Sequence, residues 1–299
     1  MNILLAMIPA FFWGTTYAVA QLTLPDWPPL LLGALRALLA GLILLLINPS
    51  LPKKSQWGIL FRLAMVNIAI FFSLIFIMAS TLPSAISGVG MVSLPAFAML
   101  YDWVINKHKP NKIQAFFGLA LIFLAWMLFN PNTIQLNPIG LMAMLMAIVC
   151  VIYGSSMTKS LGARIHWWSI LTWQLIIGGI ILTIASFIDA LIAPESYQQV
   201  ATQFEVINGL GLVWIILLNT AIAYALYVWL LQRMTVVDFT FAGIANPIAG
   251  IATGILLLDE SFTGTQYLLM GGMILASLMP QIIESIKPHL LTNTHLQYE

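Results

Sequence analysis

The chain is a succession of apolar segments, each long enough to cross a lipid bilayer, and this pattern leaves few folds open to it. A membrane-spanning helix needs about 20 mainly apolar residues. Of the 299 residues, 61% are hydrophobic and only 7% are charged, whereas a soluble domain carries about 25% charged residues. Most of the surface must therefore face lipid, and we predict an all-α polytopic membrane protein with ten transmembrane helices. The predicted spans are 3–22, 28–47, 58–80, 84–105, 113–129, 138–158, 167–188, 209–231, 236–258 and 265–286.

Positive charges fall on alternate connections between these segments. Lys and Arg flank the connections after the second, fourth, sixth and eighth segments, and Lys287 follows the tenth. The other connections hold no Lys or Arg, and their charged residues are all acidic: Asp26, Asp189, Glu195, Glu205, Asp259 and Glu260. Because Lys and Arg concentrate in cytoplasmic loops, we predict that both termini are cytoplasmic, which agrees with an even number of spans.

The first segment ends in Ala18-Val19-Ala20-Gln21, which resembles a signal-peptidase site. No Lys or Arg precedes its apolar run, however, as a secretory signal requires. We therefore interpret the segment as the first membrane helix.

The two halves of the chain share one spacing. Identical residues recur 152 positions apart, which indicates an internal duplication: Asn67 with Asn219, Pro95 with Pro247, and Gln114 with Gln266. Since each copy contains five spans, an odd number, the second copy must enter the membrane from the opposite side. We predict an inverted repeat with its first copy at 1–130, its second at 138–287 and a cytoplasmic tail at 288–299. Such repeats are typical of secondary transporters, which bind substrate near the membrane midplane.

Three motifs carry a resemblance to a known family. They are Phe12-Trp13-Gly14 in the first span, Leu35-Arg36-Ala37 in the second, and Pro247…Leu258-Asp259-Glu260-Ser261…Gln266…Gly271 in the last two. With the ten-span pattern, they resemble the EamA family of the drug/metabolite transporter superfamily over nearly the whole chain. The resemblance implies a multi-pass transporter of the bacterial inner membrane, commonly an exporter of amino acids or related compounds.

Two positions depart from the family pattern. His108 stands where the family usually has Glu, as the second repeat has Glu260, and Asp259 stands where the family has Gly. Both positions lie at the edge of a loop. The departures weaken any transfer of function to His108 or Glu260.

Arg36 is the one Lys or Arg deep inside a predicted span. An arginine at this depth is costly and usually faces a cavity or a partner. Its planar fork suits a substrate carboxylate or phosphate. It equally suits backbone carbonyls at a helix break, where it would only lock the packing.

Amides and prolines form the next group of candidates. Asn67, Asn219 and Asn246 lie near mid-membrane depth and can both donate and accept hydrogen bonds. They either contact substrate or join helices, for which such bonds contribute about 0.6 kcal/mol each. Pro95 and Pro247 are predicted kinks that free carbonyls toward a cavity, or kinks without a role, since membrane helices tolerate proline.

Aromatic residues complete the predicted substrate site. Trp13, Tyr17, Tyr153 and Tyr224 lie within spans rather than at the membrane interface, and so does Tyr227. The first four are assigned to the substrate site. A buried tyrosine hydroxyl needs a partner, which a polar cavity supplies. For Trp13 the competing role is amphipathic packing. Trp13-Gly14 and Tyr153-Gly154 also open the two halves at similar places.

The sequence gives no sign of an enzyme, a cofactor or a nucleic-acid partner. The histidines His108, His166, His289 and His295 form no metal-binding pattern, and no phosphate-binding loop occurs. The net charge of +1 offers no field for nucleic acid, and Cys150 is interpreted as a packing residue. No acid lies at midplane, so any proton coupling would use Asp102 or a loop-edge group; the alternatives are facilitated diffusion and exchange.

Two functions follow from these observations. The first is a secondary transporter of small polar metabolites, such as amino acids, that works by alternating access with the lipid bilayer and a small-molecule substrate as partners. A monomer is compatible with the sequence. The second is a non-transporting membrane assembly or sensor protein, which would have a dense core without a cavity between the halves.

Overall fold

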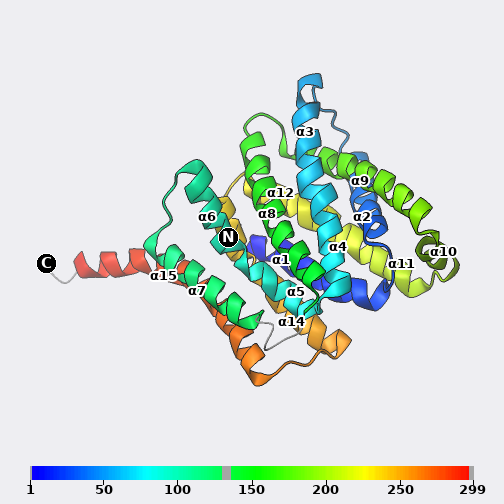
Figure 1. Cartoon of the computed structure of the whole chain (residues 1–299). Coiled ribbons are helices and arrows are strands. Elements are labelled where there is room, and N and C mark those ends of the chain that lie inside the picture. Colours follow the sequence, from blue (N-terminus) through cyan, green and yellow to red (C-terminus); the bar gives the residue numbers. More distant parts are fainter. Residues whose placement is uncertain (1, 130–135, 296–299) are drawn as a thin grey trace.

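The computed structural model describes residues 2–129 and 136–295, and every regular element in that part of the chain is helical (Figure 1). The elements of the first half are α1 (Asn2–Thr23), α2 (Pro29–Ile47), η1 (Lys54–Gln56), α3 (Trp57–Ala64), η2 (Met65–Ile70), α4 (Phe71–Thr81), α5 (Ser84–Gly90), η3 (Met91–Ser93), α6 (Leu94–Asn106) and α7 (Lys112–Leu128). Those of the second half are α8 (Pro138–Leu161), α9 (Trp167–Ile192), α10 (Pro194–Thr202), α11 (Val206–Val213), η4 (Trp214–Ile222), α12 (Ala223–Leu231), α13 (Val236–Ala242), α14 (Ala245–Leu258) and α15 (Gly264–His295).

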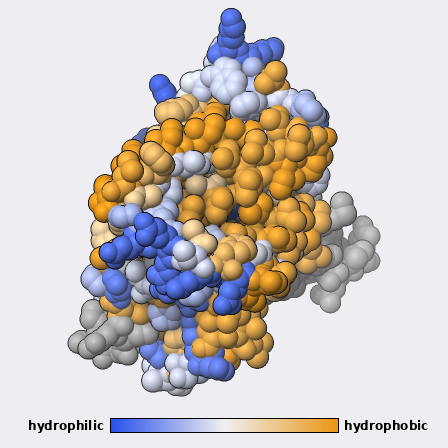
Figure 2. Space-filling model, turned by 90° about the vertical axis from the view of Figure 1, so that its right-hand side faces the viewer, coloured by the Kyte–Doolittle hydropathy of each residue, from blue (hydrophilic) through white to orange (hydrophobic). Residues whose placement is uncertain are grey.

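The fold is that of a polytopic membrane protein. Within the described residues, seven helical stretches are long and apolar enough to cross a bilayer, and two shorter apolar helices, Lys112–Leu128 and Ala245–Leu258, accompany them. Each predicted span coincides with helical structure. Figure 2 shows a broad hydrophobic band across one face, with hydrophilic residues gathered above and below it. A surface of this kind suits lipid at its middle and water at its two ends.

The structure differs most from the predicted spans in two places. The connection predicted at 189–208 contains the short helix α10, which begins at Pro194. Proline favours a first helical turn because its missing N–H would have no partner there. The last helix, α15, continues to His295 rather than ending at 286. Residues 130–135 and the tail residues 296–299 lie outside the described part of the chain.

Two long helical stretches contain a wider π-helical segment. The segment η2 carries Asn67, and η4 carries Asn219. A π segment interrupts the regular hydrogen-bond ladder and often marks a functional site. The two duplicated asparagines therefore lie in the same local distortion in each half.

Pro95 and Pro247 each lie where a helix is broken. In the first half, the short 3-10 segment η3 separates α5 from α6, and Pro95 is in the first turn of α6. In the second half, the chain turns between α13 and α14, and Pro247 follows two residues after α14 begins. Proline cannot donate to the carbonyl four residues before it, which is Met91 in one half and Gly243 in the other.

Helices from the two halves pack against one another in pairs. The pairs are α2 with α9, α5 with α14, and α7 with α15; the last pair lies side by side at one edge of the molecule (Figure 1). Glycines allow the close crossings. A Cβ on Gly179 of α9 would lie 2.5 Å from the Leu38 nitrogen of α2, and Gly88 of α5 faces the backbone of Gly250 in α14. Such small-residue crossings are common between membrane helices.

Lys107 and Asp259 end helices α6 and α14 in the left-handed conformation, with φ of 60° and 52°. They are 152 residues apart, so the duplicated helices end alike. Left-handed backbone costs a residue with a Cβ about 1–2 kcal/mol, and glycine avoids this cost.

Lys107→Gly is therefore expected to raise the free energy of unfolding by about 0.5 kcal/mol, after the larger chain entropy of glycine is subtracted. Thermal denaturation of purified protein measures the change. Lys107→Ala is the control, because it removes the same charge but keeps the Cβ. An equal gain in both variants would show that the charge, rather than the backbone conformation, is responsible.

Candidate functional site

The polar centre of the molecule is built around the backbone carbonyl of Asn219, in the π segment η4. Trp13 Nε1 donates to this oxygen at 3.0 Å and Arg36 Nη2 at 3.2 Å. The Asn219 side chain donates to Thr16 Oγ1 at 2.6 Å. The π segment η4 is thus joined to α1 by Trp13 and to α2 by Arg36. A π segment interrupts the regular hydrogen-bond ladder, and its carbonyls can then accept from side chains.

Arg36 is a buried cation, only 2% exposed. Its Nε donates to Thr220 Oγ1 at 2.7 Å, and its guanidinium lies 4.1 Å from the ring centroid of Phe72. Among the described residues no carboxylate lies within ion-pairing distance of it. Of the five guanidinium N–H groups, two have acceptors in the described part of the chain. The remaining donors and the positive charge are available to an anion.

A cavity adjoins this centre. The volume available to the centres of water molecules is about 60 Å³, enough for a few waters but not for an amino acid. It is lined mainly by aromatic and aliphatic side chains, with a few polar groups among them. The lining includes Trp13, Thr16, Tyr17, Arg36, Phe71, Ser155, Tyr224, Tyr227, Phe239, Thr240, Asn246 and Ser277.

Five of the residues predicted to contact substrate meet at this cavity: Trp13, Tyr17, Arg36, Tyr224 and Asn246. Trp13 packs edge-on against both Tyr224 and Tyr227. In the described structure the Asn246 Oδ1 atom is buried and accepts no hydrogen bond. An unpaired buried acceptor is costly, so this oxygen is a candidate partner for a substrate N–H.

Asn67 and Asn219 do not line the cavity. Both are fully buried, and each joins helices from the two halves. Asn67 Nδ2 donates to Gln174 Oε1 of α9 at 2.8 Å. Each asparagine thus contacts a polar side chain of the other half, Asn67 through its amide and Asn219 through its backbone carbonyl, which accepts from Arg36. Arg36 is seven residues after the start of α2, and Gln174 is seven residues after the start of α9. The sequence prediction missed Gln174, although its place in α9 could have identified it as the counterpart of Arg36.

Tyr153 is a correction to the predicted site. Its side chain is 43% exposed and lies outside the cavity. The helix α8 instead turns Val151 and Ser155 toward the cavity, and Ser155 Oγ lies 2.8 Å from the Tyr227 hydroxyl. The motif Tyr153-Gly154 resembles Trp13-Gly14 in sequence, but α8 presents a different face. Ser155 was missed, and Tyr227, although recognised as an aromatic residue within a span, was not assigned to the site, since α8 and α12 are apolar on most sides.

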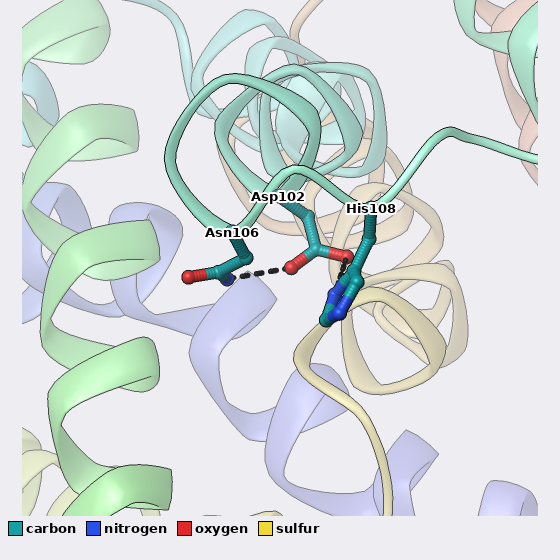
Figure 3. A network of polar contacts seen from close by, with 3 residues as sticks. All are labelled: Asp102, Asn106 and His108. Atoms are coloured by element: carbon teal, nitrogen blue, oxygen red, sulfur yellow. Dashed lines mark hydrogen bonds and ion pairs between the residues drawn. The ribbon is translucent and has the colours of Figure 1, made fainter.

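Asp102 and His108 lie at the end of α6, away from the cavity. Asp102 accepts a hydrogen bond from Asn106 Nδ2 at 2.6 Å, and its other oxygen lies 3.4 Å from His108 Nδ1 (Figure 3). The His108 side chain is 75% exposed and that of Asp102 34%. Such an exposed pair contributes little to stability, and it is not placed to bind a solute in the central cavity.

Tyr227→Phe is expected to lower solute affinity about fivefold, because it removes a hydroxyl from the cavity wall and leaves Ser155 without this partner. Tyr153→Phe is the matched control, since the same atom is lost from a side chain on the outer surface. Titration of solute binding in detergent measures both. Equal losses in the two variants would contradict the assignment of Tyr227 to the cavity.

A polytopic helical membrane protein with a buried, partly polar cavity at its centre has the features of a solute transporter. The EamA-like transporter family matches residues 1–130 and 138–279. The chain belongs to this family and is a membrane transporter rather than an enzyme.

Named relatives agree with this assignment. The chain is 29% identical over 262 residues to Protein PecM of Dickeya dadantii, covering 85% of this chain and 83% of the relative. It is 24% identical over 276 residues to the uncharacterized inner membrane transporter YedA of Escherichia coli, covering 88% and 85%. It is 24% identical over 271 residues to a probable amino-acid metabolite efflux pump of Escherichia coli, covering 88% and 89%.

The fold also occurs in a solved structure. A protein crystal structure superposes with a TM-score of 0.66 at 14% identity, covering 94% of this chain and 96% of the other. At this identity the match concerns the fold alone.

Proposed function

We propose that the protein is a secondary transporter that exports small carboxylate-bearing solutes, such as amino acids or related compounds, across the bacterial inner membrane by alternating access. The observation that carries this proposal is Arg36. It is a buried charge at the cavity wall with no counter-ion among the described residues and with free donors. A solute carboxylate would neutralise it through charge-assisted hydrogen bonds.

The other cavity groups complete an amino-acid-like site. Asn246 Oδ1 is an unpaired acceptor in the described structure and would receive an ammonium N–H. The aromatic wall of Trp13, Tyr224 and Tyr227 would hold the rest of the solute by apolar contact. The name of one relative, a probable amino-acid metabolite efflux pump, supports the same class of solute and the same direction of transport.

The helix pairs support the ten-span inverted repeat, and the alternation of Lys and Arg between connections supports cytoplasmic termini. A two-fold axis in the membrane plane places equivalent helices of the two copies in contact. The second, fourth and fifth spans of each half pair with their counterparts, as α2 with α9, α5 with α14 and α7 with α15. The cavity is too small for an amino acid as it stands, so binding requires the halves to move apart, as alternating access entails.

Flux measurements test the proposal. Purified protein in proteoliposomes is expected to exchange one or more labelled amino acids across the bilayer, with protein-free liposomes as the control. Nucleosides and neutral sugars, which lack a carboxylate, are expected to give background flux. Flux of neutral solutes alone would contradict the role of Arg36, and absence of flux for every solute by folded protein would contradict transport.

Membrane topology is tested separately. Reporter fusions at the N-terminus and after residue 299 are both expected to report the cytoplasm, because ten spans return the chain to the side on which it started. A reporter in the 189–208 connection serves as the control and is expected on the opposite side. Termini on opposite sides would contradict the inverted repeat.

A further inference from the structure

The Glu260 carboxylate binds the first turn of a helix from the other half of the protein. Its Oε1 accepts from the Ser84 backbone N–H at 2.5 Å and its Oε2 from that of Ala85 at 3.0 Å. These N–H groups begin α5, where no intrahelical acceptor exists for them. A carboxylate is also favoured there by the partial positive charge of a helix N-terminus. Glu260 therefore fastens the α14–α15 connection to the start of α5.

Gly254 makes room for this contact. A Cβ at Gly254 would lie 2.5 Å from Glu260 Oε2 and 3.3 Å from the Ala85 nitrogen. Any larger residue would push the carboxylate away from α5. The fastening thus depends on a glycine in the last part of α14 and on a glutamate six residues later, in the connection that follows.

The equivalent positions in the first half are occupied differently. The residues 152 positions before Gly254 and Glu260 are Asp102 and His108, and α13 starts at the position equivalent to Ser84. These residues lie at the far end of the broken helix α5–α6. Asp102 and His108 pair with each other (Figure 3).

A hollow of about 220 Å³ remains beside this pair. It is lined by Met99, Asp102, His108, Lys109, Pro110, Gln114, Thr235 and Val237. Hollows lie at both ends, since one of about 650 Å³ lies beside Leu82 and Pro83 at the Glu260 end. The difference among the described residues is that a carboxylate binds the start of a helix at the Glu260 end, with no equivalent contact at the Asp102–His108 end.

We propose that Glu260 is a positioning residue for transport, a latch that holds α5 against the α14–α15 connection and so opposes opening at that end, with no equivalent carboxylate contact at the Asp102–His108 end among the described residues. This inference rests on the proposed alternating-access function. During transport the Glu260 contact must break each time the cavity opens at that end. Breaking the contact exposes two helix N–H groups and one carboxylate to water. The free energy of this step contributes to the balance between the state open at the Glu260 end and the state open at the Asp102–His108 end.

Thiol labelling tests the latch without knowledge of the solute. In the background Cys150→Ala, which removes the single native cysteine, Ser87→Cys supplies a reporter. Ser87 is fully buried in α5, three residues after Ser84. Protein in lipid nanodiscs is treated with a water-soluble maleimide.

Glu260→Gln keeps the size of the side chain but replaces one acceptor oxygen by a donor, and it is expected to raise the labelling rate about tenfold. His108→Gln, at the equivalent position, is the control and is expected to leave the rate unchanged. The proposal would be overturned if Glu260→Gln labelled at the same rate as the protein with glutamate at this position. It would also be overturned if His108→Gln raised the labelling rate equally.

A transplanted latch provides a test that leaves Glu260 intact. Asp102→Gly combined with His108→Glu gives the first half the same two residues as the second. With Thr240→Cys as reporter in the cavity wall, the double variant is expected to label several-fold more slowly, because the new carboxylate can bind the start of α13. An unchanged rate in folded protein would overturn the latch. Labelling changes without flux of any solute would instead overturn the transport function alone.

Discussion

Arg36→Gln is expected to lower the affinity for carboxylate-bearing solutes about a hundredfold or more. Loss of one partner from a buried, hydrogen-bonded charge pair costs roughly 2–5 kcal/mol, and the cavity would then hold no positive charge among its described lining residues. The measurement is a titration of the purified variant with the amino acid that gives the highest flux. The amide of the same amino acid, which lacks the carboxylate, is the control ligand and should bind both proteins alike.

The same substitution also removes the bonds from Arg36 to Thr220 and Asn219, so a packing role must be separated from a binding role. Arg36→Lys keeps the charge but loses the planar fork. We expect it to retain part of the affinity for the carboxylate. If Arg36→Gln lowers thermal stability yet binds the amino acid as tightly as the unchanged protein, then Arg36 only locks helix packing and the proposed site is wrong.

Gly14→Ala is expected to destabilise the protein by about 3 kcal/mol or more. A Cβ at Gly14 would lie 2.2 Å from the Asn246 carbonyl oxygen and 2.8 Å from the Ala249 Cβ. These atoms belong to the rigid start of α14, so α1 and α14 would have to separate. Overpacking of this kind typically costs 1–3 kcal/mol and occasionally more, and here the obstacle is backbone rather than a flexible side chain.

Thermal denaturation of detergent-solubilised protein, followed by the loss of monodisperse material, measures this effect. Gly58→Ala is the matched control, because Gly58 is in helix α3 and a Cβ there meets nothing within 4 Å. Alanine has a higher helix propensity than glycine, by about 1 kcal/mol, so the Gly58→Ala control is expected to be slightly more stable than the unchanged protein. Equal stability of the Gly14→Ala and unchanged proteins would mean that α1 and α14 are less closely packed than the structure shows.

Features that depend on a single helix, such as its extent and its breaks, could be predicted from the sequence. Hydropathy located the helical segments because lipid requires long apolar stretches. The 152-residue spacing predicted that Asn67 and Asn219 would share an environment, and the structure places both in π segments. Pro95 and Pro247 marked the regions of the broken helices, since proline removes a backbone donor wherever it occurs.

Contacts between distant helices were not accessible in the same way. The sequence predicted no function for Glu260, which lies at the edge of a loop. In the structure it binds Ser84 of α5, 176 positions earlier in the chain. Gln174 was missed because its position in α9, although it matches that of Arg36 in α2, does not show that its amide meets Asn67. Tyr153 was placed in the cavity by its likeness to Trp13, but the structure turns it outward.

The sequence by itself determined the class of fold and the helical segments, because these depend on hydrophobicity and backbone donors along the chain. Only the tertiary structure decided which side chains meet at the cavity and which end is fastened. The rotation of a helix about its own axis is set by the neighbours it packs against, and in a helix that is apolar on most sides no pattern of polar residues reveals it.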